Sequence, residues 1–141
     1  MSNLAVKQIA ISNPTGLGRV GLQFTNESGS PCKLDGYPAL AFRDAAGVLP
    51  LRPHHLGSSL PETVLPNHST FSIVSQYRCD MGESRAANKT TISLPGEAGG
   101  STSIAGGPAI CRPGILHRES KVTVTPFQSL RAAYRVSLVN N

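Results

Sequence analysis

The stretch RVGLQFT at residues 19–25 is the clearest structural signal in the chain. Its apolar side chains Val20, Leu22 and Phe24 recur at every second position. This period of two is typical of a β-strand with one buried face. Polar turn residues follow at 26–31. The stretch therefore predicts a half-buried strand that ends in a turn.

Similar segments recur along the chain, separated by turn signals rich in Gly, Pro, Asn and Asp. They cover residues 4–11, 37–43, 48–51, 63–65, 69–77, 89–94 and 121–125, with residues 44–47 as the turn of a hairpin. No segment carries a sustained stripe of period 3.6. We therefore predict an all-β, antiparallel, immunoglobulin-like sandwich of about seven to nine strands. A small barrel is the alternative.

The whole chain, 1–141, is interpreted as a single domain, because its length suits one domain and no linker divides it. The final segment, 130–139, fits either a strand or a helix that starts near residues 131–134. We predict a strand, which forms a C-terminal extension over 128–141. Residues 53–60 and the Gly-rich residues 97–107 are expected to be loops.

The net charge of +5 comes from Lys and Arg residues that are scattered rather than clustered. This pattern predicts no nucleic-acid partner. A mild positive field suits anionic headgroups, envelope polymers or an acidic protein, and a solvated surface explains it equally well. No stretch approaches the roughly 20 apolar residues of a membrane span. Residues 1–4 open directly into a strand-like pattern, so we expect no signal peptide in this sequence.

The chain has three cysteines, Cys32, Cys79 and Cys111. Cys79 and Cys111 each lie just past or within a strand-like segment, and a disulfide between them would close a loop of about 30 residues. We predict this disulfide; two buried thiols in a reducing compartment are the alternative. Cys32 is left over, which indicates a free thiol, a lost partner or an intermolecular bridge. The spacing of the cysteines and histidines predicts no metal site.

The run NESGSPCKLDGYP at residues 26–38 is the most distinctive motif. It resembles the N-x-S-G-x-x-C-x-L-x-G-Y-P signature of an actinobacterial family of secreted proteins and lipoproteins, the domain of unknown function 4232. Residues 65–69 look like the strand-entry turn of that family, and Cys79 and Cys111 match its two later cysteines. The resemblance covers roughly residues 4–127.

The resemblance implies a β-sandwich outside the cytoplasmic membrane, often behind a lipid anchor in the native precursor, with no established activity. In that family the cysteine matching Cys32 commonly pairs with one near the start of the domain. Residues 1–3 offer no such cysteine. The strand predicted after residue 127 also extends past what the family implies.

The same motif has a physical interpretation as a structural corner. Asn26 can hydrogen-bond the local backbone in a turn, and Gly29 and Gly36 allow positive φ. Tyr37 precedes Pro38 and is therefore expected to be extended. The motif predicts a structural role for these five residues rather than catalysis.

The four histidines, His54, His55, His68 and His117, are expected to be exposed loop residues. Adjacent His54 and His55 cannot point the same way on a strand, so they predict no metal site. The chain has no GxSxG elbow, few carboxylates and no GxxxxGK[ST] phosphate loop. We therefore predict no enzyme, no catalytic residue and no cofactor.

These observations lead to a first hypothesis: a non-enzymatic, extracytoplasmic cell-envelope module that binds an unknown protein or envelope ligand. Its candidate binding loops are 54–59 and 96–107, where the backbone is expected to be freest. The residues singled out there are His54, His55, Gly99, Gly100, Gly106 and Gly107. The second hypothesis is a structural subunit of a larger assembly, such as a virion surface or envelope complex. A small hydrolase is the third.

Overall fold

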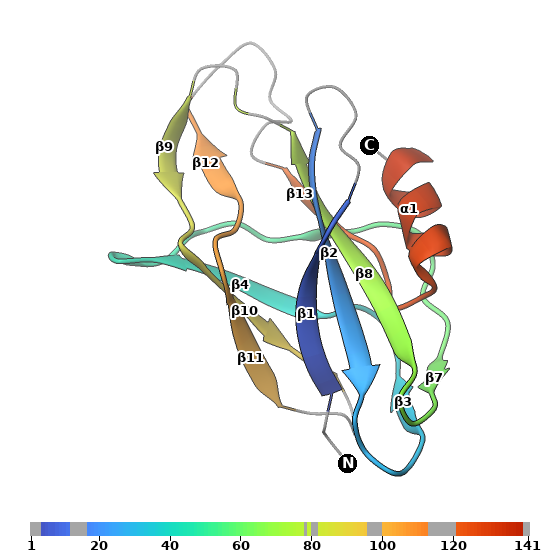
Figure 1. The fold of residues 1–141 in the computed structure, drawn as a ribbon. Helices are drawn as coiled ribbons and strands as arrows, with labels where there is room; N and C mark the ends of the chain where they lie inside the picture. Colours follow the sequence, from blue (N-terminus) through green and yellow to red (C-terminus); the bar gives the residue numbers. More distant parts are fainter. Residues whose placement is uncertain are drawn as a thin grey trace.

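A computed structural model of the chain describes residues 4–11, 17–77, 79, 82–95, 100–112 and 121–139. Two β-sheets pack against each other, and a helix at the C-terminal end lies on the outer side of the larger sheet (Figure 1). The prediction of an all-β, sandwich-like single domain is confirmed. The predicted turn at 13–16 lies outside the described residues.

The larger sheet has five strands in the order β1-β2-β8-β13-β6. Its longest ladder joins β2 to β8, antiparallel, from the Leu17–Tyr77 pair to the Thr25–Ser69 pair. The pairing of β13 with β6 is parallel. The strand bounds are β1 (Leu4–Ala10), β2 (Leu17–Asn26), β8 (Ser69–Tyr77), β13 (Val122–Val124) and β6 (His54–His55).

The smaller sheet has the order β11-β10-β4-β5 and contains the predicted hairpin around residues 44–47. Two further strand pairs lie at the ends of the sandwich, β12 with β9 and β3 with β7. The bounds are β4 (Ala39–Asp44), β5 (Gly47–Val48), β10 (Lys89–Ser93), β11 (Ser101–Ala105), β9 (Glu83–Ala86), β12 (Ala109–Cys111), β3 (Cys32–Leu34) and β7 (Glu62–Val64).

The core lies between the two sheets, where alternate residues of each sheet meet. Leu22 and Phe24 of β2 pack in one cluster with Ile92 of β10 and with Phe127. The rings of Phe24 and Phe127 meet edge to face, with centroids 5.2 Å apart, an arrangement that aromatic pairs favour. The alternation at 19–25 therefore predicted the correct inward face of β2.

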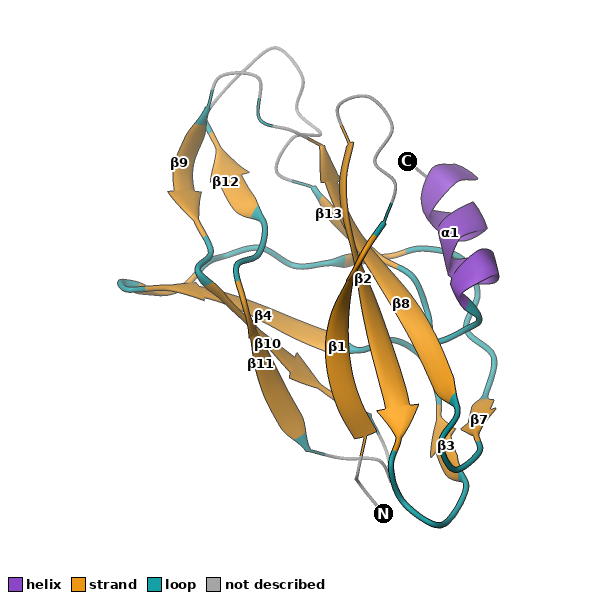
Figure 2. Cartoon of the chain, viewed as in Figure 1, coloured by secondary structure: helices purple, strands orange, loops and turns teal. Residues whose placement is uncertain are grey.

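The predicted strand over 128–141 is wrong, because Leu130–Val139 forms the helix α1 (Figure 2). Ser129 caps this helix: its side-chain oxygen accepts a hydrogen bond from the backbone N–H of Ala132 at 3.2 Å. Ala133 and Ser137, four residues apart and so on one face of the helix, are both fully buried. The alternation at 134, 136 and 138 misled the prediction, since packing on a sheet selects the helix.

The described residues form thirteen strands, more than the seven to nine expected. The additional strands are short and poor in apolar residues. They include β11, which lies in the predicted Gly-rich loop 97–107, and β6, which lies in the predicted loop 53–60. Their sequences carry little hydrophobic signal, because edge strands need only pair with a neighbour.

Candidate ligand pocket

The motif at residues 26–38 builds the corner that was predicted. Asn26 is fully buried. Its side-chain oxygen accepts hydrogen bonds from the N–H and hydroxyl of Ser28, at 2.9 and 2.7 Å. Its side-chain nitrogen donates to the carbonyls of Ser30 and Val64, both at 2.8 Å. Asn26 thus ties the end of β2 to strand β7.

The other motif residues lie along the chain from this corner. Gly36 adopts a φ of +83°, which glycine allows, whereas Gly29 has no positive φ. The Tyr37 hydroxyl donates to the carbonyls of Leu56 and Gly57 at 2.9 and 2.8 Å, and burial raises the pKa of this hydroxyl. Pro38 is buried beside it.

The segment 54–59, predicted as a loop with a free backbone, is held in place. His54 and His55 are exposed but form β6 against β13. The ring of His55 stacks on Tyr37 with centroids 3.9 Å apart. Gly57 adopts a φ of +70°, and a Cβ there would lie 3.1 Å from Val136 of helix α1. These contacts fix residues 54, 55 and 57 against neighbouring elements; the role of the segment in binding stays a prediction.

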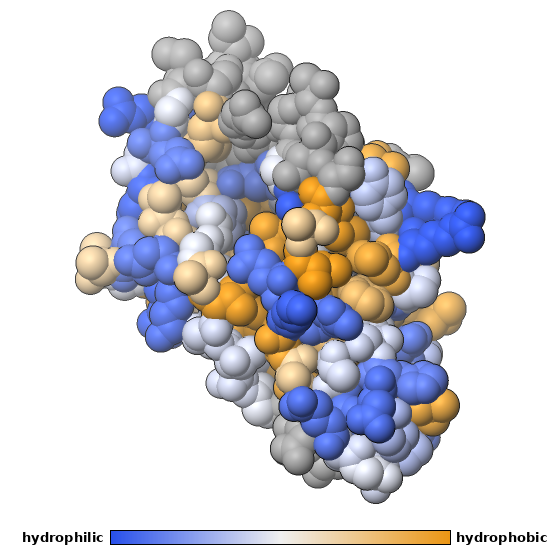
Figure 3. Space-filling model, in the orientation of Figure 1, coloured by the Kyte–Doolittle hydropathy of each residue, from blue (hydrophilic) through white to orange (hydrophobic). Residues whose placement is uncertain are grey.

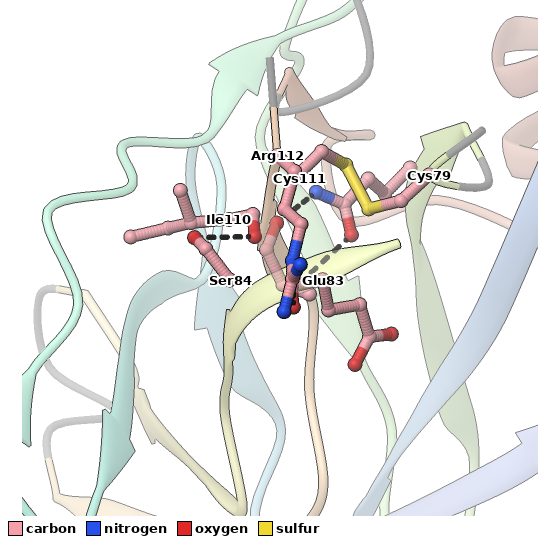
Figure 4. Close-up of a disulfide and its surroundings, with 8 residues drawn as sticks. Cys79, Glu83, Ser84, Ile110, Cys111 and Arg112 are labelled. Carbon is pink, nitrogen blue, oxygen red and sulfur yellow. Dashed lines mark hydrogen bonds between the residues drawn. A yellow bond between two sulfur atoms is a disulfide. The ribbon is translucent and has the colours of Figure 1, made fainter. Parts of the chain in front are cut away.

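The predicted disulfide between Cys79 and Cys111 is present, with Cα atoms 5.2 Å apart (Figure 4). It joins β12 to the chain that follows β8. The Arg112 side chain donates to the Glu83 carbonyl at 3.3 Å, and the Ser84 hydroxyl donates to the Ile110 carbonyl at 3.1 Å. These bonds hold β9 and β12 together at one end of the sandwich.

Cys32 lies apart from this disulfide. It is fully buried in the main core cluster and pairs with Val64 across the β3–β7 ladder. Its place beside Leu34 shows that it packs as a small core residue.

A pocket of about 360 Å³ opens between the two sheets. One wall is the inner face of β2 and β8, with Val20, Leu22 and Val74; the other contains Phe42, Ile104 and Pro108. Figure 3 shows hydrophobic surface on this side of the molecule, between β1 and the β10–β11 pair. The strands β1 and β11 are both edge strands of their sheets, so the sandwich is open here.

The chain passes close to the pocket wall at Gly107. A Cβ at this position would lie 2.6 Å from the Thr90 hydroxyl and 2.9 Å from the Cβ of Ala87. Glycine is therefore required for the segment 106–108 to run beside residues 87–88, with which it shares backbone hydrogen bonds, and form one side of the pocket. The Thr90 hydroxyl donates to the carbonyl of Gly106 at 2.8 Å, which ties the start of that segment to β10.

The end of the pocket near the disulfide is closed by the Gln76 side chain. Its amide nitrogen donates to the Ala109 carbonyl at 2.6 Å, and its amide oxygen accepts from the Ala109 N–H at 3.0 Å. These two hydrogen bonds resemble those between paired β-strands, and they connect β8 to β12. Cys79 and Glu83 line the same end.

Among the described residues that line the pocket, two are charged, Arg19 and Glu83. The Arg19 side chain points to the outer face of the sheet, where it donates to the Ser137 hydroxyl at 3.1 Å. Its guanidinium carbon also lies 4.6 Å from the centre of the Tyr134 ring. Glu83 is exposed, and its carboxylate extends away from the Arg112 guanidinium (Figure 4). Among the described lining residues, the charged side chain that remains on the pocket side is therefore the carboxylate of Glu83.

The sequence predicted part of this site. Gly106 and Gly107, two of the four glycines singled out, line the pocket, whereas Gly100 does not and Gly99 lies outside the described residues. The residues missed are Gln8, Gln76, Glu83 and Thr90. These residues carry no local signal: Gln76 shares its face of β8 with Thr70 and Ser72, the polar side of the alternation at 69–77.

No group of three His, Cys, Asp or Glu residues that could hold a metal ion occurs in the described part of the chain. His54, His55 and His68 are all exposed, and His117 lies outside the described residues. Within the same ranges, no helix has both the length and the apolar character to cross a membrane.

The fold and the pocket define a class: an all-β sandwich domain, cross-linked between Cys79 and Cys111, with a pocket between its sheets. A family model described as "Domain of unknown function (DUF4232)" matches residues 1–128. The chain therefore belongs to this family, as the motif at 26–38 implied. Helix α1 follows the matched residues. No curated protein and no solved structure matches the chain.

Proposed function

We propose that this chain is a non-enzymatic, extracytoplasmic binding domain that takes a small ligand into the pocket between its sheets. In this proposal it works in the cell envelope of an actinobacterium, where a lipid anchor on a longer precursor would hold it. The observation that carries the proposal is the pocket itself, whose wall is made of inward-facing apolar residues that remain partly exposed.

Three of those residues, Val20, Val74 and Ile104, sit at core-facing positions yet are only half-buried. Apolar surface left in water costs free energy, roughly 25 cal/mol for each Å². A ligand that covers these side chains regains that free energy. The volume, about 360 Å³, falls at the lower end of the roughly 300–1,000 Å³ that small-molecule sites occupy.

The disulfide supports the compartment. Disulfides persist in oxidising settings and are rare in the reducing cytosol. The Cys79–Cys111 bond spans a sequence separation of 32, which in the loop-entropy model stabilises the fold by about 3–4 kcal/mol. A domain that depends on such a bond suits the cell envelope.

Binding in the pocket is tested with N-phenyl-1-naphthylamine, an uncharged aromatic probe that becomes fluorescent in apolar surroundings. We expect saturable binding to the wild-type protein. Ile104→Trp places a large ring in the pocket and is expected to weaken binding about tenfold or more. Gln8→Trp narrows the pocket from the opposite sheet and is expected to act in the same direction.

The matched control is Ser103→Trp, on the same edge strand but outside the pocket lining. This variant is expected to bind the probe as the wild type does, and circular dichroism checks that all three variants fold. No saturable binding to the wild type, or equal weakening by Ser103→Trp, would contradict the proposed pocket function.

The extracytoplasmic location is tested by alkylating the cysteine thiols of protein that has been isolated from its native compartment and unfolded in denaturant. We expect Cys79 and Cys111 to resist iodoacetamide until a reductant is added, as shown by mass spectrometry of the peptides. Alkylation of both before reduction contradicts the extracytoplasmic assignment.

A further inference from the structure

We infer that the ligand of this pocket is a small apolar molecule whose polar end is an amine, or another group that donates hydrogen bonds, rather than a carboxylate. The inference rests on the proposed binding function and specifies the chemistry of the ligand. It follows from two observations: which polar groups of the pocket lining already form hydrogen bonds within the protein, and which charged side chain of the lining does not.

The donors of the pocket lining are largely used within the protein. The Gln76 amide nitrogen donates to Ala109, and the Thr90 hydroxyl donates to Gly106. The Arg19 guanidinium is turned to the outer face, against Ser137 and Tyr134. In the described lining, an anion finds the neutral amide of the exposed Gln8 but no cationic side chain that is turned toward the pocket.

The charged acceptor among the described lining residues is the carboxylate of Glu83; the exposed Gln8 amide also lines the pocket, and it is neutral and offers both a donor and an acceptor. Glu83 is exposed and lines the end near Cys79, and the described residues form one salt bridge, Arg85 to Asp44, which does not include it. A carboxylate accepts hydrogen bonds and attracts a cation, but repels a second carboxylate. The ligand head that fits is therefore an ammonium group.

The apolar walls and the volume determine the rest of the ligand. The cavity of about 360 Å³ is more than twice the roughly 150 Å³ cavity that holds a benzene ring. A short alkyl chain or a small ring system that extends from Glu83 toward Val20 and Ile104 covers the half-buried wall. The expected class is a small primary-amine amphiphile.

Three competitors of equal chain length test the head group: decylamine, decanol and decanoate. Each is used at concentrations below its own critical micelle concentration to displace bound N-phenyl-1-naphthylamine from the protein. We expect decylamine to displace the probe at a concentration about five- to tenfold lower than decanoate, the effect of one partly solvated charge. This order runs against the net charge of +5, which by itself attracts the anion.

Glu83→Gln is expected to bring decylamine and decanoate within about twofold of each other, with decanol unchanged. Glu27→Gln, which removes an exposed carboxylate outside the pocket, is the matched control and should keep the preference. Equal or stronger displacement by decanoate, or a preference for decylamine that survives Glu83→Gln, overturns the inference. If the inference on the head group fails but Ile104→Trp still blocks probe binding, the proposed binding function stands. If the wild-type protein does not bind the probe, both the proposed function and the inference fail.

Discussion

On the outer face of the five-stranded sheet, helix α1 covers Arg19 and Ser75, which are 4% and 1% exposed. On the inner face of the same strands, beside the pocket, Val20 and Val74 are only half-buried. Residue types alone predict the opposite, since polar side chains favour water and apolar ones favour the core. The alternation of apolar and polar residues along a strand therefore predicts which side chains share a face of the sheet. It does not predict whether another element of the fold covers that face.

The largest loss of stability is expected from a substitution in the contact between helix α1 and the outer face of the sheet. Ala133 of helix α1 is fully buried against the sheet, so Ala133→Glu forces a charge and extra volume into this contact. We expect the free energy of unfolding to fall by about 3–5 kcal/mol, measured by urea denaturation. The exposed Arg131→Ala on the same helix is expected to change it by less than about 0.5 kcal/mol. Equal effects would mean that the helix does not pack as described.

A slightly smaller effect is expected at the end of the pocket on the inner face. Replacing both Cys79 and Cys111 with alanine removes the disulfide and is expected to cost about 3–4 kcal/mol of unfolding free energy. The bond between Gln76 and Ala109 remains to hold β12. Reduction of the wild-type protein should lower its stability by a similar amount, and an unchanged melting temperature after reduction would contradict this prediction.

A third prediction concerns the hydrogen bond between Arg19 and Ser137, which lies between helix α1 and the outer face of the sheet. Arg19 donates to the Ser137 hydroxyl at 3.1 Å and lies over the Tyr134 ring. A double-mutant cycle of Arg19→Met and Ser137→Ala is expected to give a coupling energy of about 1–2 kcal/mol, because the hydrogen bond is buried and charge-assisted. A coupling near zero would show that Arg19 is held by packing of its alkyl stem.

The smallest effect concerns the smaller sheet, at the turn of its β4–β5 hairpin. Arg85 donates to both carboxylate oxygens of Asp44, at 2.7 and 2.8 Å, and these hydrogen bonds hold the pKa of Asp44 at about 2, below its ordinary 3.8. The resulting stability is present above the ordinary pKa and is lost as the pH falls through the lowered one. We expect unfolding midpoints to drop between about pH 4 and pH 2, and Asp44→Asn to flatten this step.

Local signals predicted the features that depend on near neighbours. Asn26, Ser28 and Ser30 lie within five positions of one another, so their turn bonds follow from residue type and spacing. The disulfide was predicted from two cysteines that flank strands. The helix α1 was not predicted in this way, because the alternation at residues 134, 136 and 138 favoured a strand.

The pocket could not be predicted, because its residues come from segments far apart in the chain. The link from Gln76 to Ala109 spans 33 positions, and the need for glycine at 107 comes from Thr90 of another strand. Glu83 carries no local signal that separates it from any other exposed carboxylate. Only the folded chain sets these groups around one cavity.

The sequence by itself determined the β-rich class, the inward face of β2, the corner at Asn26 and the pair of cysteines that cross-link, because these depend on periodicity and on neighbours a few residues apart. The tertiary structure decided that residues 130–139 form a helix, that this helix buries Arg19 and Ser75, and that the sheets diverge around a pocket. The physical reason is that burial is shared between distant segments, so it is settled only when those segments pack.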